Sequence, residues 1–84
     1  MKKDNFEKLS MAEQGMALIS EGKHITQIKK ENYLINLYSI DDFFVEVYYS
    51  VIDNHIDKIE IMTDLSKIDL YIDEKRPADS IETN

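Results

Sequence analysis

The sequence predicts an α+β fold, with an N-terminal helix packed on a four-stranded antiparallel meander and followed by a short C-terminal helix. Three observations support this class. A capped helical pattern opens the chain, four segments rich in Ile, Val, Tyr and Phe follow it, and short polar turns separate those segments. Short connections favour antiparallel neighbours. The 84 residues allow one domain, which we place at residues 1–74, with a polar, disordered tail at residues 75–84.

The first helix is expected over residues 10–22. Ser10 and Glu13 have the spacing of a capping box, in which each side chain bonds the backbone N–H of the other residue. Gly22 suits the left-handed residue that often ends a helix. Gly15 in the middle costs about 1 kcal/mol relative to alanine, which a close approach of helix and sheet would explain.

The apolar residues of this helix define the side expected to face the sheet. Ala12, Met16 and Ile19 recur at helical spacing, with Met11 and Leu18 beside them. Phe6 and Leu9 precede the cap and are expected to pack as a lead-in turn. We therefore predict that Phe6, Leu9, Met16 and Ile19 cover one face of the sheet.

The period then changes to two, and four strands are predicted at residues 24–28, 32–39, 43–50 and 55–62. Ile25 and Ile28 differ in parity, so the first strand needs a bulge to present both to one side. Most apolar residues of the other three strands are odd-numbered: Tyr33, Ile35, Leu37, Phe43, Val45, Val47, Tyr49, Ile59 and Ile61.

Cross-strand partners share a face, so this parity predicts the register. Leu37 should lie opposite Val45, and Val47 opposite Ile59. Both pairings leave three-residue loops, at residues 40–42 and 52–54. The last residue of such a loop usually adopts positive φ, and Asp42 and Asn54 stand there, as residue types that tolerate that conformation.

After the fourth strand, Leu65, Ile68 and Ile72 step by three and four, which predicts a short helix at about residues 65–74. Ile68, Leu70 and Ile72 also alternate, so a fifth strand is the alternative.

The charge is uneven along the chain. Residues 1–30 hold six basic and four acidic residues, net +2, whereas residues 31–84 hold four basic and thirteen acidic residues, net −9. Such a surface disfavours direct nucleic-acid binding, which depends on clustered Lys and Arg. No apolar run approaches the roughly 20 residues of a membrane helix, and no signal peptide is apparent, so we expect a cytoplasmic protein.

The catalytic motifs are missing from the sequence. There is no cysteine, and the glycines at 15 and 22 make no phosphate loop. The acidic pairs 41–42 and 73–74 lie at a turn and a helix end. We expect no enzyme and no cofactor.

The even face of the meander is the candidate binding surface. In the predicted register, five residues form one patch there: Leu34, Tyr38, Phe44, Glu46 and Tyr48. Contiguous aromatic groups on a wet face mark contact surfaces. The second helix, a second copy of the chain or another protein could cover this patch, or it could remain exposed.

The leading functional expectation is a small, non-catalytic, acidic protein-interaction domain that acts through this aromatic sheet face or through its acidic surface, with inhibitor, antitoxin-like or nucleic-acid-mimic roles open to it. The alternative is a small-ligand or metal-binding domain centred on His55. Alternation places Asp53, His55 and Asp57 on one side, and carboxylate-imidazole-carboxylate is a workable ligand set for a divalent metal. Against it, Asp53 falls in a predicted turn, where Asp is common for backbone reasons.

Overall fold

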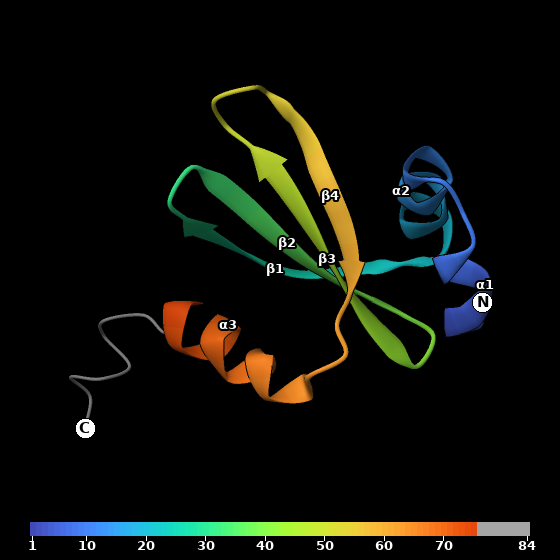
Figure 1. The fold of residues 1–84 in the computed structure, drawn as a ribbon. Coiled ribbons are helices and arrows are strands. Elements are labelled where there is room, and N and C mark those ends of the chain that lie inside the picture. Colours follow the sequence, from blue (N-terminus) through green and yellow to red (C-terminus); the bar gives the residue numbers. More distant parts are fainter. Residues whose placement is uncertain (76–84) are drawn as a thin grey trace.

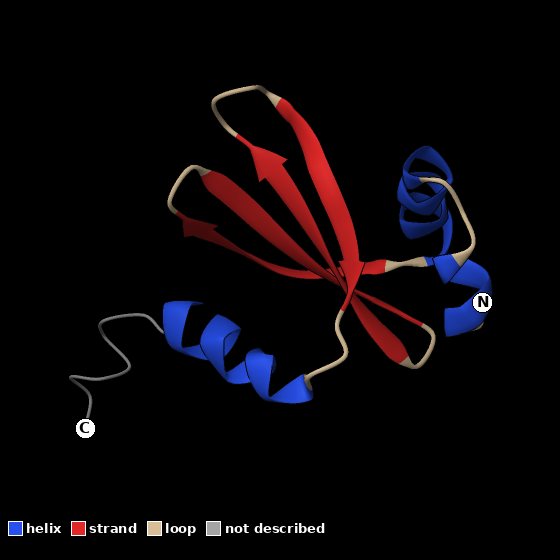
Figure 2. Cartoon of the chain, in the orientation of Figure 1, coloured by secondary structure: helices blue, strands red, loops and turns tan. Residues whose placement is uncertain are grey.

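A four-stranded antiparallel sheet forms the middle layer of the structure, with helices on both of its faces (Figure 1, Figure 2). The strands lie side by side in chain order as β1 Lys23–Lys30, β2 Tyr33–Ile40, β3 Phe43–Ser50 and β4 His55–Ile61. The helical elements are α1 Lys3–Glu7, α2 Met11–Glu21, the 3-10 turn η1 Leu65–Lys67 and α3 Ile68–Lys75. This computed structural model describes residues 1–75, and for residues 73–75 the backbone alone. It confirms the predicted α+β class and the order of its elements.

β1 joins the sheet through the bulge that its sequence predicts. Pairing with β2 shifts between His24 and Thr26, which leaves Ile25 as the extra residue. Beyond the shift, Ile28 lies opposite Ile35, and both side chains are buried.

The register between β2 and β3 differs from the prediction by one residue. Tyr38, rather than Leu37, lies opposite Val45, and the hairpin closes with two residues, Asp41 and Asp42. The residue with positive φ is Asp41, at 53°, not Asp42. The predicted three-residue loop was wrong because β2 is apolar on both sides, so its parity does not say which side matches the odd residues of β3.

The register between β3 and β4 is the predicted one at its centre. Val47 lies opposite Ile59, and Asn54 has the expected positive φ, 62°. The pairing shifts by one residue near the turn, so the loop spans residues 51–54 and is one residue longer than predicted.

α1 and α2 cover one face of the sheet. Phe6 is fully buried against Phe43, with ring centroids 5.7 Å apart, and Leu9 packs at the edge of the same cluster, as predicted. The buried residues of this cluster are Phe6, Ala17, Leu18, Ile40, Phe43, Val45 and Val47. The odd residues of β3 and β4 therefore do face the N-terminal helices, but they are joined there by the even residues of β2.

α2 turns a different side to the sheet from the one predicted. Ala17 and Leu18 are buried, whereas Met16 and Ile19 are 70% and 84% exposed. Ala12 is exposed as well. The prediction failed because α2 has two apolar sides, and the side with the more regular spacing points outward.

The two glycines of the N-terminal region also differ from expectation. Gly22 has φ −83°, so it does not end α2 in the left-handed conformation. A Cβ built there would lie 2.7 Å from the carbonyl oxygen of Leu18, so glycine is needed because the backbones approach closely. A Cβ on Gly15 would meet no atom within 4 Å, so no close approach requires that glycine. The capping box of Ser10 and Glu13 is present as predicted.

α3 covers the opposite face of the sheet, so residues 65–72 are helical rather than a fifth strand (Figure 1). Tyr71 is buried in a second cluster with Ile28, Ile35, Leu37 and Met62. Neither α3 nor any other described helix is long and apolar enough to cross a membrane. Of the tail predicted at residues 75–84, residues 76–84 lie outside the described part of the chain.

Candidate functional site

A buried carboxylate lies where α3 crosses the sheet. Glu46, in the middle of β3, is only 3% exposed. Its Oε1 accepts a hydrogen bond from Lys67 Nζ at 2.9 Å, and its Oε2 accepts one from the Tyr71 hydroxyl at 2.6 Å. We call these three residues the Glu46 network. Lys67 and Tyr71 are four residues apart on the η1–α3 segment, a spacing that brings them to one side of a helix.

The Glu46 network shifts the acid–base properties of its two donors. Burial, followed by the hydrogen bond to Glu46, raises the pKa of Tyr71 far above its ordinary value of 10.0. The hydrogen bond to Glu46 raises the pKa of Lys67. Burial raises the pKa of the neighbouring Tyr48, and the Glu46 charge adds to the shift. Tyr71 and Lys67 therefore keep their protons at neutral pH and remain hydrogen-bond donors.

A hollow of about 310 Å³ opens beside the Glu46 network, between α3 and the β1–β2 end of the sheet. Tyr33 and Tyr48 form part of its wall, with their rings edge to face at 5.9 Å. The volume is at the lower limit for small-molecule sites. Each oxygen of Glu46 already accepts one hydrogen bond, from Lys67 or from Tyr71.

The predicted site includes Glu46 but neither of its two hydrogen-bond donors. The sequence does contain a sign of them, because a charged residue in the middle of an apolar strand needs a partner. Lys67 and Tyr71, at helical spacing in the next predicted helix, meet that need. The predicted apolar side of this helix was wrong in part, since Leu65 and Ile72 are 61% and 54% exposed.

The structure does not place the five predicted partner-binding residues on one face. Phe44, Glu46 and Tyr48 lie on the side covered by α3, with Glu46 buried. Leu34 and Tyr38 lie on the other side, because the β2–β3 register differs by one residue. Tyr38 packs against the cluster under α1 and α2. α3, the predicted C-terminal helix, is thus what covers Phe44 and Tyr48 of β3.

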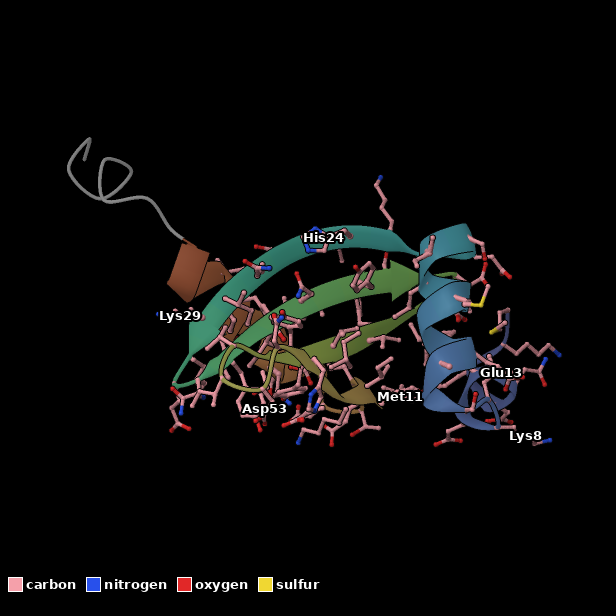
Figure 3. The ribbon with its side chains drawn as sticks, turned by 90° about the horizontal axis from the view of Figure 1, so that it is seen from above. Lys8, Met11, Glu13, His24, Lys29 and Asp53 are labelled. Carbon is pink, nitrogen blue, oxygen red and sulfur yellow. The ribbon has the colours of Figure 1, made fainter. Side chains whose placement is uncertain are left out.

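The outer side of α2 carries an apolar stripe. It consists of Ala12, Gly15, Met16 and Ile19, which recur at intervals of three and four, and we call it the α2 outer stripe. Figure 3 shows α2 standing across one end of the strands, so only one side of the helix packs on them.

The predicted metal-ligating residues do come together. Asp53, His55 and Asp57 are all exposed, and one ligand atom of each lies within 4.8 Å of the others. We call them the tip cluster, because they lie at the β3–β4 turn and the start of β4. Asp53 lies away from α2 (Figure 3).

Comparison with known proteins gives no relative from which a function could be inferred. No family model matches the chain, and no curated protein or solved structure shows a significant match to it.

Proposed function

We propose that this protein is a non-catalytic protein-interaction domain that self-associates through the α2 outer stripe. The observation that carries the proposal is the exposure of Ile19 and Met16, at 84% and 70%. They are the two most exposed large apolar side chains among the described residues, and they lie three residues apart on one helix. Single exposed apolar residues are ordinary, whereas a contiguous apolar helix side is typical of a contact surface.

The composition of the α2 outer stripe suits a second copy of the chain as its occupant. In an antiparallel pair of α2 helices related by a two-fold axis, a register that places Ala12 opposite Ile19 of the second copy also places Gly15 opposite Met16 of the second copy. Each large side chain then meets a small one in both directions. Such self-complementarity is what an interface between identical surfaces requires.

The proposed dimer explains why a glycine occupies position 15, which packing within the single chain does not explain. A Cβ at this position would meet nothing within 4 Å, so packing inside the chain does not demand glycine. Across the two-fold axis, the missing side chain would leave room for Met16 of the second copy.

The α2 outer stripe itself contains no charged residue, so no charge within it is buried when two copies meet there. The chain as a whole carries a net charge of −7, so two copies repel each other. Because salt screens this repulsion, association should strengthen as salt is added.

The interface should be small. α2 has 11 residues, about 16 Å of helix at 1.5 Å per residue, so it buries less than the roughly 800 Å² per partner of a standard interface. We therefore expect a weak, reversible dimer that forms at high protein concentration. The narrower inhibitor, antitoxin-like and mimic roles stay predictions from the charge.

Sedimentation equilibrium over a range of concentrations into the millimolar tests the proposal. The wild-type chain should shift from monomer to dimer, and Ile19→Asp should stay monomeric with an unchanged melting temperature. Ile52→Asp is the matched control, since Ile52 is 69% exposed but lies in the β3–β4 loop. It should dimerise like the wild type.

Two outcomes would contradict the proposal. A wild-type chain that remains monomeric at every concentration and salt would exclude a second copy as the occupant. Equal loss of the dimer in Ile19→Asp and Ile52→Asp would mean that the contact does not use the α2 outer stripe.

A further inference from the structure

The ligand atoms of the tip cluster are close enough together to bind one metal ion. His55 Nε2 and Asp57 Oδ1 are 3.1 Å apart. Two ligand atoms bound to one ion at about 2.1 Å lie roughly 3.0–3.4 Å apart in octahedral or tetrahedral geometry, so this pair already has nearly the separation of two ligands. The widest spacing in the cluster, up to 4.8 Å, must shorten, and an exposed carboxylate can rotate to do so.

Two hydroxyl groups from outside the cluster contact its carboxylates and orient them. The Tyr33 hydroxyl, from β2, donates a hydrogen bond to Asp57 Oδ2 at 2.6 Å. The other carboxylate oxygen, Asp57 Oδ1, faces His55. The Ser50 hydroxyl contacts Asp53 Oδ2 at 3.4 Å, and the backbone N–H of Asp53 donates to the Ser50 hydroxyl at 3.1 Å. Hydrogen bonds that orient the ligands from a second layer are characteristic of protein metal sites.

Asp53 belongs to the β3–β4 turn, as predicted, because β4 begins at His55. The four-residue loop nevertheless returns its side chain to the ligand atoms of His55 and Asp57. Asn54, the last residue of this loop, has a positive φ of 62°.

We propose that the tip cluster binds a divalent transition-metal ion through Asp53, His55 and Asp57, with water in the remaining positions. One imidazole and two carboxylates suit ions of the Zn²⁺, Ni²⁺ and Co²⁺ kind. Mg²⁺ prefers oxygen ligands alone and retains its waters, so it gains little from His55. The ion takes the place of the His55–Asp57 hydrogen bond and joins the turn to β4.

Zinc binding to the tag-free protein, measured by isothermal titration calorimetry, tests this proposal. The wild-type chain should bind one Zn²⁺ with saturation, and much less tightly Mg²⁺. His55→Gln and Asp57→Asn should each weaken Zn²⁺ at least about 10-fold. Tyr33→Phe, which removes no ligand, should weaken it by about 10-fold, as loss of a ligand-orienting hydrogen bond does.

His24, the other histidine of the chain, provides a control for the zinc-binding experiment. His24 bonds Asn36 on β2, away from the tip cluster, so His24→Gln should bind Zn²⁺ like the wild type. Zinc should raise the melting temperature of the wild type and of His24→Gln but not of His55→Gln. In NMR spectra, the imidazole signals of His55 should shift on titration while those of His24 stay.

Three results would overturn the proposal. One is the absence of saturable Zn²⁺ binding. Another is equal binding of Zn²⁺ and Mg²⁺, which would indicate a general attraction of cations to acidic side chains. The third is unchanged affinity in His55→Gln.

Discussion

Tyr71 on α3 donates a hydrogen bond to Glu46 in the middle of β3, with the two oxygens 2.6 Å apart. The bond joins residues that are 25 positions apart in the chain and is buried. Together with Lys67, it ties the last described helix to the centre of the sheet.

Tyr71→Phe should lower the free energy of unfolding by about 1.5–3 kcal/mol, because a hydrogen bond to a buried charge is lost. Urea unfolding followed by circular dichroism measures this. Tyr38→Phe is the control, since the Tyr38 hydroxyl makes no hydrogen bond to any described residue. A Tyr71→Phe variant as stable as Tyr38→Phe would show that the Glu46 bond contributes nothing.

The raised pKa values of Tyr71 and Lys67 predict a loss of stability in base. Burial and the Glu46 bond raise the pKa of Tyr71 above 10.0, and the Glu46 bond raises that of Lys67 above 10.5. A raised folded-state pKa stabilises the folded chain fully below the unfolded value, and this contribution is lost as pH rises through the folded value. The free energy of unfolding should therefore fall from about pH 10 upward.

Urea unfolding between pH 8 and pH 11 should show this fall in the wild type. It should be shallower in the triple variant Tyr71→Phe, Lys67→Met and Glu46→Leu, which lacks both titrating groups and leaves no unpaired buried charge. Parallel decline of the two proteins would mean that other groups cause it.

The two glycines should respond oppositely to alanine. Gly15→Ala should raise the free energy of unfolding of the monomer by about 0.5–1 kcal/mol, because alanine favours the helix and the space is open. Gly22→Ala should lower it, because its Cβ would lie 2.7 Å from the Leu18 carbonyl oxygen. Thermal melts of dilute protein compare them. If Gly15 serves the proposed dimer, Gly15→Ala should weaken association while it stabilises the monomer.

Val47 and Ile19 provide a second matched pair. Val47 is 7% exposed under α1 and α2, so Val47→Asp should bury an unpaired charge and abolish cooperative unfolding. Ile19→Asp should change the melting temperature of the monomer by no more than a degree or two, because that side chain is exposed. A stable Val47→Asp variant would mean that this face of the sheet is not part of the core.

In this chain the sequence predicts local structure better than it predicts strand register or which side of an element is buried. The conflicting parity of two isoleucines indicates a bulge in the first strand, which the structure places at Ile25, and Ser10 with Glu13 predicts the cap of α2. β3 was predicted at the observed residues 43–50. In each case the signal lies within a few neighbouring residues.

The errors arose where a segment is apolar on two sides. β2 lies between two layers of helices, so both its odd and even residues are partly or fully buried, and alternation does not fix its register. α2 has the same ambiguity, and the sheet contacts Ala17 and Leu18 instead of Met16 and Ile19. Only tertiary packing decides such cases.

The candidate sites also differ in whether their residues are close together in the sequence. The tip cluster was predictable, because its three residues lie within five positions of one another. The Glu46 network was not recognised, because its donors come from a helix 21 and 25 positions later in the chain. A strand glutamate among apolar neighbours was the one available clue.

The position of Glu46 has a consequence that depends on the order in which the chain is synthesised. α3 is the last described element to leave the ribosome, so the sheet face beneath it, with Ile35 and Leu37, is bare until then. Such a face would stack on other nascent chains, but a hydrated carboxylate at its centre opposes this, as charged gatekeeper residues do in apolar strands. Once Lys67 and Tyr71 emerge, the same carboxylate becomes the point at which the last described helix attaches to the sheet.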